Sequence, residues 1–326
     1  MSEAAHAPVV DLSVVVLAWN QLEVTKRCVD SIRANTDVEY ELVIVDNGSN
    51  EEAATWLEEA ADTHVRHDTN LGFSPGMNAG LHVARGAAIA FVNNDTTLPP
   101  GWASSLLETL GPTKVGIALP AVTAAGNPFA VRTQAGSDRI RVPPFRYLPS
   151  GVVYVMRSDV VRSLGAWGEE YEIASREDLD LLFKTWVNGM DVVLDERVLV
   201  DHVSGATAVA ELDDRDEVWK RNRDVFTAKW TSADSDSIPY IGAVDRAQYD
   251  TLLEEARTTA AWMERLFAAE DRIEEWKAEV RSQKQRAGTA ERRAEAAESR
   301  PTPLSDLVYR IERRLRGPKS PERPSD

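Results

Sequence analysis

Two short apolar runs near the N-terminus decide the fold class. They read Leu12-Ser-Val-Val-Val-Leu-Ala18 and Tyr40-Glu-Leu-Val-Ile-Val-Asp46. Continuous runs of this length, rich in β-branched residues, are typical of strands buried on both faces of a parallel sheet. A helix is predicted between them, and the alternation continues with helices over 51–61 and 75–85 and strands over 64–67 and 87–93. The pattern predicts a three-layer α/β domain with a mainly parallel sheet.

The rest of this domain is less regular in sequence. Residues 111–150 are rich in Gly and Pro, and we expect an irregular segment there. Beyond it, strands are predicted over 151–156, 191–194 and 198–200. A helix starts near Glu177 and ends before a C-terminal glycine at 189. The domain is predicted to span residues 1–235.

A different composition begins at residue 246 and predicts a long helix over 246–299. A stripe with three- and four-residue steps, interrupted by Glu270 and Lys277 at two core positions, consists of Tyr249, Leu252, Ala256, Thr259, Met263, Leu266, Ile273 and Val280. Such a heptad-like stripe favours a homo-oligomeric coiled coil over 246–282. The final segment, 300–326, contains a short basic amphipathic helix over 304–316 and a disordered tail. That basic helix favours peripheral contact with an anionic membrane surface.

Composition excludes several classes of protein. The net charge of −16 argues against a nucleic-acid partner, because phosphate binding needs clustered Lys and Arg. A single cysteine, Cys28, allows neither an intrachain disulfide nor a Cys-based zinc site, and indicates a reducing compartment. No signal peptide is recognisable, and no apolar run approaches the roughly 20 residues of a membrane span. We expect a cytoplasmic protein that can work at the inner membrane surface.

Polar residues follow three of the predicted strands. Asn20 comes two residues after the first, Asp46 ends the second, and Asn93-Asn94-Asp95 ends the strand over 87–93. Ligands of open α/β sheets bind at the carboxyl ends of the strands. These three groups are therefore predicted to meet in one binding site.

Five motifs now make a resemblance recognisable. They are Ser13-Val-Val-Val-Leu-Ala-Trp-Asn20, Val45-Asp-Asn-Gly-Ser49, Asn70-Leu-Gly-Phe-Ser-Pro-Gly-Met-Asn-Ala-Gly80, Phe91-Val-Asn-Asn-Asp-Thr96, and Arg176-Glu-Asp-Leu-Asp-Leu181 followed by His202. In this order, over about residues 10–230, the chain resembles the family 2 glycosyltransferases of the GT-A fold. Within that family it looks most like the rhamnosyltransferase-like branch.

The resemblance implies inverting transfer of a sugar from a nucleotide diphosphate to an acceptor hydroxyl. It assigns nucleotide-sugar binding to Ala18, Asn20, Asp46, Asn70, Gly72, Asn78, Asn93 and Asn94. Asp178 would be the general base, and Glu177 would bind acceptor hydroxyls beside it. Asp95 and His202 would hold a divalent cation, Mg²⁺ or Mn²⁺, which neutralises the leaving diphosphate.

One motif departs from the family pattern. The family has Asp-x-Asp where this chain has Asn93-Asn94-Asp95, so an amide replaces the first carboxylate. Asn93 can still offer a carbonyl oxygen, but strict metal dependence is left open. Each of these residues also has a possible structural role. Asn20 would be a simple loop residue, Asp46 would cap a turn, and the acids at 177–180 would stabilise a helix N-terminus.

Other residues have two readings. Trp167 and Tyr171 would either stack on a sugar or pack in the core. A basic cluster at 220–223 would either contact the diphosphate or form a solvated face. Cys28 is read as a small buried apolar group without chemistry.

The expected donor is a deoxythymidine or uridine diphosphate sugar, and the branch resemblance favours dTDP-rhamnose. The expected acceptor is a cell-surface glycan or a lipid-linked saccharide, with a small metabolite or a protein as open alternatives. Two rival functions are weighed. A sugar-nucleotide pyrophosphorylase would need a Gly-rich basic loop after the first strand, and Asn20-Gln-Leu-Glu-Val lacks one. A degenerate transferase domain serving as a coiled-coil scaffold is favoured only by Asn93.

Overall fold

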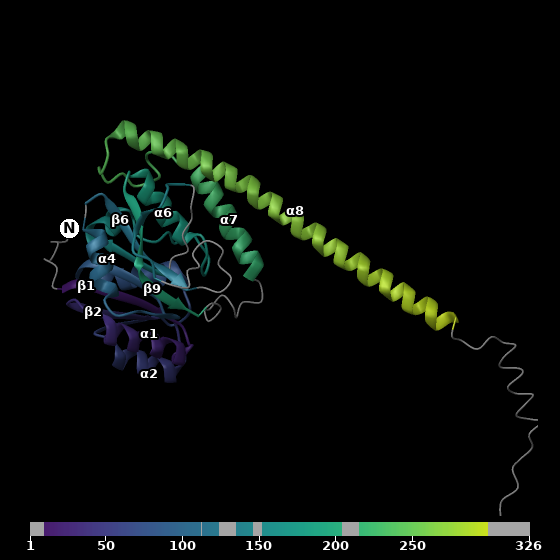
Figure 1. Cartoon of the computed structure of the whole chain (residues 1–326), viewed down its shortest axis with the longest axis horizontal. Coiled ribbons are helices and arrows are strands. Elements are labelled where there is room, and N and C mark those ends of the chain that lie inside the picture. The colour runs from purple at the N-terminus through teal and green to yellow at the C-terminus, as the bar shows by residue number, and fades with distance from the viewer. Residues whose placement is uncertain (1–9, 112, 124–134, 146–151, 204–214, 299–326) are drawn as a thin grey trace, which may run out of the picture. The chain divides into compact units, whose positions relative to one another are not determined.

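A computed structural model of the chain describes residues 10–111, 113–123, 135–145, 152–203 and 215–298. The chain divides into two compact units, Met1–Arg265 and Leu266–Asp326. The first unit is built on one nine-stranded sheet with helices on both faces (Figure 1).

The first half of the sheet is parallel, as the apolar runs predict. Its strands lie in the order β3-β2-β1-β4, with bounds β1 Val10–Ala18, β2 Tyr40–Asp46, β3 Thr63–Arg66 and β4 Gly86–Asn93. Both neighbours of β1 run parallel to it. All four strands therefore end at the same edge of the sheet.

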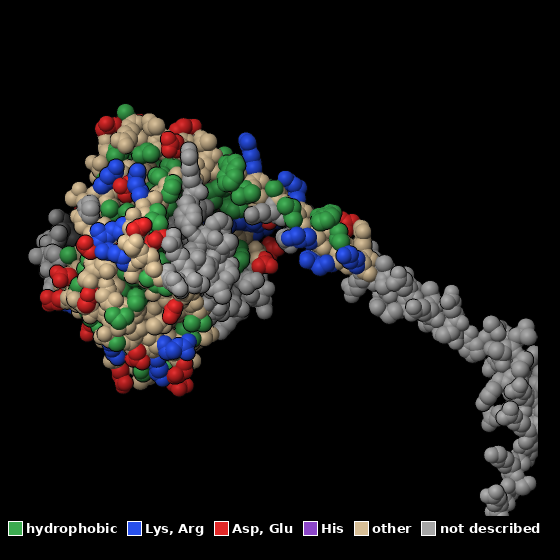
Figure 2. Space-filling view, in the orientation of Figure 1, with side chains coloured by type: hydrophobic (Ala, Val, Ile, Leu, Met, Phe, Trp, Pro, Cys, Tyr) green, Lys and Arg blue, Asp and Glu red, His purple; other side chains and the backbone are tan. Residues whose placement is uncertain are grey.

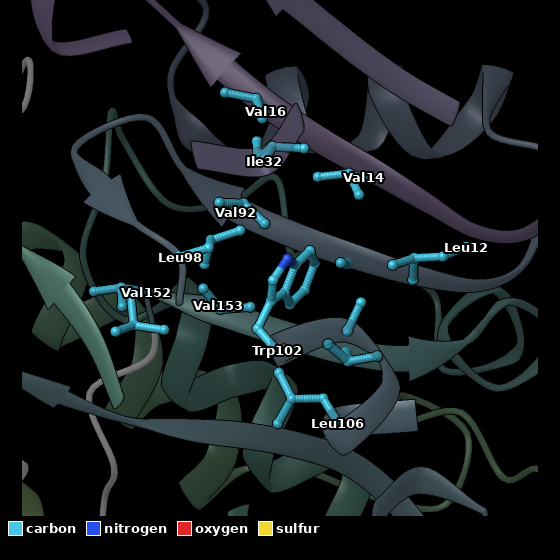
Figure 3. Close-up of a cluster of buried hydrophobic side chains, with 14 of the residues drawn as sticks. Leu12, Val14, Val16, Ile32, Val92, Leu98, Trp102, Leu106, Val152 and Val153 are labelled. Carbon is cyan, nitrogen blue, oxygen red and sulfur yellow. The ribbon is translucent and has the colours of Figure 1, made fainter. Parts of the chain in front are cut away.

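Helices cover the two faces of this parallel half. Residues of α1 (Leu22–Asn35), α2 (Glu51–Ala60) and α4 (Trp102–Leu110) share one apolar cluster with the strands. The indole of Trp102 lies in that cluster among side chains of β1 and β4 (Figure 3). Helix α3 (Phe73–Val83) packs on the other face. A Cβ at its Gly80 would overlap the Val15 side chain, so the glycine allows close helix–sheet packing.

The second half of the sheet corrects one prediction. The expectation of an irregular 111–150 segment is wrong for Val115–Thr123, which forms the buried strand β6 between β8 (Val153–Arg157) and β9. Gly and Pro within the run suggested a loop. Pro120 is tolerated because the register with β9 shifts directly after it, where a bulge interrupts the ladder.

Strand β9 (Asp191–His202) replaces the two short strands predicted there. The polar residues between them sit at the bulge opposite Pro120 and do not end the strand. Two short strands, β5 (Thr96–Thr97) and β7 (Arg139–Arg141), pair antiparallel with β9. Through β5, the turn after β4 lies beside the end of β9.

Helices α6 (Glu177–Val187) and α7 (Arg215–Thr231) share an aromatic core, whereas the short helix α5 (Ser158–Ser163) packs against β4 and β8. Phe183 of α6 contacts Trp186, Phe226 and Trp230, all of them fully or almost fully buried. These contacts join α6 to α7.

Helix α8 (Arg246–Glu298) belongs to both units. The first unit reaches Arg265, past the predicted domain end at 235, because the first turns of α8 bury Tyr249, Leu253, Ala256, Ala260 and Met263. The Tyr249 hydroxyl also donates to the Ile238 carbonyl at 2.8 Å. The first part of the predicted coiled-coil stripe is therefore used for packing within the chain.

The described part of the second unit is the stretch of α8 from Leu266 to Glu298. The predicted basic helix over 304–316 and the tail to 326 lie outside the described residues. Among the helices that the structure describes, none has the length and apolar character to cross a bilayer.

Candidate active site

The strand ends bring three of the predicted residues to one edge. Ala18 pairs with Asp46 across β1 and β2, and Leu17 pairs with Asn93 across β1 and β4. Because the pairs are in register at the carboxyl ends, the polar groups after these strands are neighbours. The predicted juxtaposition of the strand-end residues follows from this register.

Asp46 and Asn20 belong to one hydrogen-bonded group. The Asp46 carboxylate accepts from the Ser49 amide at 2.7 Å, and the Ser49 hydroxyl accepts from the Asn20 amide at 2.8 Å. Oδ2 of Asp46 is buried and accepts no hydrogen bond from the residues that the structure describes, and Nε of Arg66 lies 3.6 Å from it in an ion pair. This oxygen could accept from a ligand hydroxyl or N–H. Arg66 is a neighbour that the sequence analysis missed.

Asn47 ties the glycine-containing loop to the strand ends. Its amide nitrogen donates to Oδ1 of Asn70 at 2.8 Å and to the Gly72 carbonyl at 3.1 Å, and its Oδ1 accepts from the Leu71 amide. Gly72 has φ +94°, a conformation that L side chains rarely adopt. Asn70 and Gly72 are thereby held beside Asp46.

Helix α1 holds the turn after β4 in place. The Asn94 amide donates to the Thr25 hydroxyl at 2.9 Å, and the Asn93 carbonyl accepts from the Thr96 hydroxyl at 2.8 Å. Cys28 lies under the same turn and is fully buried, and this burial raises the pKa of its thiol to about 12. The prediction of an unreactive buried Cys28 agrees with this environment.

Asp95 and His202 meet because β5 pairs with β9. Thr96 lies opposite His202 in that ladder, and Nε2 of His202 is 3.2 Å from Oδ1 of Asp95. Both carboxylate oxygens of Asp95 are buried, and neither accepts a hydrogen bond from the described residues. A buried carboxylate in this state is costly unless a cation or a donor completes it.

The donor set at Asp95 fits a divalent cation that is shared with a ligand. Within the described ranges, no group of three His, Cys, Asp or Glu side chains could hold an ion by protein atoms alone. Mg²⁺ is commonly bound by one or two carboxylates together with substrate phosphates. The buried oxygens of Asp95 and the imidazole of His202 suit this arrangement, in which the ligand supplies the other oxygens.

A second acidic group begins helix α6. Glu177 is buried, whereas Asp178 is partly exposed. Burial, and next the negative charge of Asp178, raise the pKa of Glu177 to about 8. Burial also raises the pKa of Asp178, although its Oδ1 accepts from the Leu179 amide at 2.7 Å. Two adjacent carboxyl groups with raised pKa values are suited to general acid–base work near neutral pH.

The loop before these carboxyl groups is conformationally strained. Ile173, Ser175 and Arg176 have φ values of +54°, +101° and +78°. A positive φ is unusual for any non-glycine residue, and for a β-branched one such as Ile173 it is a true outlier. Strained residues of this kind persist where the surrounding structure holds them, and they concentrate at functional sites.

This loop is joined to the strand-end group beside Gly72. The Phe73 amide donates to the Ile173 carbonyl. The backbones are so close here that a Cβ at residue 72 would lie 3.1 Å from the Cα of Ile173. From α7, the fully buried Asn222 donates to the carbonyls of Glu172 and Ala174 and accepts from the Glu172 amide. The sequence analysis missed Asn222, since it sits inside a cluster of charged residues at 220–223.

The third acid of the motif has a different environment. Asp180 is buried and lies 3.0 Å from Nζ of Lys184 and 2.8 Å from Nζ of Lys229, and it accepts from the Trp230 indole at 2.9 Å. Burial opposes its ionisation, but the two ammonium groups outweigh burial and hold the pKa of Asp180 below its usual value. Asp180 therefore joins α6 to α7.

Three other predicted residues have packing or bracing contacts. The Asn78 side chain donates to the Trp167 carbonyl and to Glu169, and accepts from the Trp167 amide, so its polar atoms are bonded within the protein. Trp167 and Tyr171 are buried, and Trp167 makes edge-to-face contacts with three aromatic rings. Core packing is the reading that the structure supports for both aromatics.

Comparison with known proteins places the chain in a family. The model of the family described as glycosyl transferase family 2 matches residues 13–153, which include the strand-end group. The protein Mb1552 of Mycobacterium bovis is 30% identical over 215 residues, which cover 62% of this chain and 78% of that relative. The chain belongs to glycosyl transferase family 2. The predicted family is thereby confirmed, while the rhamnosyltransferase-like branch stays a prediction.

Two further similarities bear on this family 2 domain. The succinoglycan biosynthesis protein ExoO of Rhizobium meliloti is 32% identical over 111 residues, 33% of this chain and 32% of the relative. The chain spans about a third of the length of the first curated relatives it matches. Staphylococcus aureus TarS, crystallised with UDP-GlcNAc, aligns with a TM-score of 0.57 at 16% identity, covering 76% of this chain and 72% of TarS. This likeness confirms the predicted α/β GT-A fold.

Proposed function

We propose that the chain is an inverting glycosyltransferase that moves a sugar from a nucleoside diphosphate to a hydroxyl of a glycan or lipid-linked acceptor. The observation that carries the proposal is the joined geometry of its two halves. The strand-end group around Asp46 and the acid pair at Glu177 and Asp178 meet through the contact between Phe73 and Ile173. The strand-end group suits a nucleotide-sugar donor, and the acid pair suits an acceptor hydroxyl.

The proposed nucleotide site is built from groups that hydrogen bonds hold in place but whose hydrogen-bonding atoms are not all used. Oδ2 of Asp46, which accepts no hydrogen bond from the described residues, suits the N–H of a pyrimidine base or a ribose hydroxyl, and Ala18 and Asn20 lie beside it. Asn70 and Gly72 bring backbone close to the same place. Similar solved proteins bind UDP-GlcNAc and UDP, which supports a nucleotide ligand. For the sugar, we retain dTDP-rhamnose as the donor that the branch resemblance favours.

Asp95 and His202 would hold the divalent cation, with Asn93 and Asn94 forming the turn around it. When bound, such a cation stabilises the negative charge of a departing diphosphate. The contribution of the chain itself is a buried carboxylate beside His202 whose oxygens accept no hydrogen bond from the described residues. The amide at 93 leaves the protein with one carboxylate at this turn, so the donor must supply more of the oxygen ligands.

The acid pair divides into two roles. Asp178 is the proposed base because it is partly exposed and its raised pKa strengthens it as a proton acceptor. Glu177 is protonated at neutral pH and can donate a hydrogen bond to an acceptor oxygen. As the acceptor oxygen attacks the anomeric carbon, its proton passes to Asp178 and the sugar–phosphate bond breaks on the opposite face.

A thermal-shift panel tests the donor half of the proposal. UDP-GlcNAc, UDP-glucose, GDP-mannose and dTDP-rhamnose would each be added with Mg²⁺, with Mn²⁺ and with EDTA. Ligands that bind only the folded state raise the melting temperature by mass action. We expect a rise with one nucleotide class that is reduced in EDTA. A rise unaffected by EDTA would contradict the cation at Asp95, and no rise with any donor would contradict the transferase proposal.

The rival function is a scaffold that has lost transfer. The amide at Asn93 is the one feature that favours it. Measuring release of nucleoside diphosphate from the donor that binds separates the two. A donor that binds with the affinity of a substrate but is never cleaved, with any saccharide acceptor or with water, would favour the scaffold.

A further inference from the structure

An apolar stripe on the second unit remains uncovered. Leu266, Ile273 and Trp276 expose 39%, 51% and 64% of their surface. With the half-buried Ala269 and Val280, they follow each other at steps of three, four, three and four residues. The described part of this unit is helix α8 alone, and Figure 2 shows hydrophobic side chains between Lys and Arg along that helix. The stripe has the a/d spacing of a two-stranded coiled coil.

This register differs from the one read from sequence alone. The predicted stripe placed Met263 and the charged residues 270 and 277 at core positions, which weakened it. Burial in the structure assigns Met263 to the first unit and leaves the face with Ala269 and Trp276 free for a partner. Extended to the end of α8, the new register has Gln283 and then alanine at positions 287, 290, 294 and 297. Charged residues occupy none of these a and d positions.

The charges beside the stripe favour a second copy of this chain in parallel orientation. In a parallel in-register dimer, each g residue faces the e residue five positions later in its partner. Four of the five such pairs have opposite charges in the sequence: Arg265–Glu270, Glu279–Lys284, Arg286–Glu291 and Arg293–Glu298. The fifth, Arg272 with Lys277, is repulsive.

The antiparallel arrangement places these charges badly. It faces g positions with g positions, and four of the five g residues are arginine. With the two helices fully overlapped, every g–g pair would join like charges. Like charges across a helix interface are destabilising. The sequence therefore discriminates between the two orientations.

We propose that α8 forms a parallel, in-register, two-stranded coiled coil between two copies of this chain, over residues 266–298. Most of the stability of a helix in a protein comes from packing of its apolar face, and pairing provides that burial for this stretch. The proposal does not depend on the proposed transfer reaction. It predicts a dimer whose two sheet domains enter the coiled coil from the same end.

Light scattering after size exclusion tests the stripe on the full chain. The wild type is expected at twice the mass of one chain, and the double variant Ile273→Asp with Trp276→Asp at the monomer mass. The matched control, Ala268→Asp with Ser282→Asp, adds the same charge at outer c positions and is expected to remain dimeric. A monomeric wild type, or a double variant that stays dimeric, would overturn the proposal.

Cysteine cross-linking tests the orientation. Ala269→Cys and Gln283→Cys are separate variants at d positions 14 residues apart, and the native Cys28 is buried. In a parallel in-register dimer, each new thiol faces its own copy, so both variants are expected to form an intermolecular disulfide on mild oxidation. An antiparallel dimer has its symmetry axis at only one place and allows at most one of them. Self-linking of one variant alone, or of neither, would overturn the parallel assignment.

Discussion

Helix α6 presents three carboxyl groups in two contrasting environments. Glu177 and Asp178 follow a strained loop, and burial raises the pKa values of both although the positive charge of Arg176 opposes the shift. Asp180, three residues after Glu177, is closed in by Lys184, Lys229 and the Trp230 indole, and its pKa is lowered. The same acidic motif thus contains two carboxyl groups with raised pKa values and one that is ion-paired with lysines.

The difference shows how tertiary partners divide the work of one motif. Burial alone disfavours a charged carboxylate, and this effect dominates at Glu177. At Asp180 the same burial is outweighed first by Lys184, one turn later in α6, and next by Lys229 of α7. A helix start with three acids therefore predicts neither role for any one of them.

The largest expected effect is on turnover in Asp178→Asn. Loss of a positioned general base costs typically about 10²–10⁴-fold in rate, and we expect a loss in this range with an unchanged melting temperature. The measurement is release of nucleoside diphosphate from the donor identified by thermal shift. Asp159→Asn is the matched control, because Asp159 also accepts from the next residue's amide at the start of a helix, away from the site. Full activity of Asp178→Asn would refute the base assignment.

Substitution of Asp180, in contrast, is expected to lower the stability of the fold. Asp180→Asn leaves buried Lys184 facing an amide, and removal of one partner from a buried ion pair costs about 3–5 kcal/mol. We expect the free energy of unfolding in urea to fall by this amount. Since the pKa of Asp180 is lowered on folding, its stabilising contribution is present above its ordinary value of 3.8 and is lost as the pH falls below it. A variant as stable as the wild type at pH 7 would contradict the structural role.

The brace on the strained loop gives a smaller, mixed effect. Asn222→Ala removes three hydrogen bonds to residues 172 and 174 and leaves those backbone groups unpartnered, which costs about 1–3 kcal/mol. We also expect turnover to fall by more than donor affinity, because the loop positions Glu177 and Asp178 but does not hold the nucleotide. Kinetics with the donor varied separates the two effects. Equal loss of affinity and of turnover would contradict a positioning role.

A further expected effect is the pH dependence of stability due to Glu177. Its pKa rises from 4.5 to about 8 on folding, so the folded protein keeps a proton that the unfolded chain releases between these values. Stability contributed by this group therefore falls as the pH rises from about 4.5 to about 8. Glu177→Gln removes the titration, and we expect its melting temperature to decline less over this range, by several degrees. An unchanged pH profile would show that Glu177 is ionised in the folded state.

Much of the site was predictable because it depends on local chain order. Strands of a parallel sheet end at one edge, so Asp46 and Asn93 had to be close once their strands were recognised. Strand β6 was missed because Gly116 and Pro120 suggest a loop, and only the bulge against β9 makes a strand acceptable there. Arg66 and Asn222 were missed because their partners are distant in sequence.

By itself, the sequence determined the α/β class, the alternation of strands and helices along the first part of the chain, the strand-end position of the polar motifs and the opposed charges along α8. These depend on side-chain periodicity and on charge order, which are properties of the chain itself. The tertiary structure alone decided which face of α8 packs within the first unit, which acid of residues 177–180 is ion-paired with lysines, and where His202 lies relative to Asp95. Each of these depends on partners brought together by folding, since burial and Coulomb interactions act through space and not along the chain.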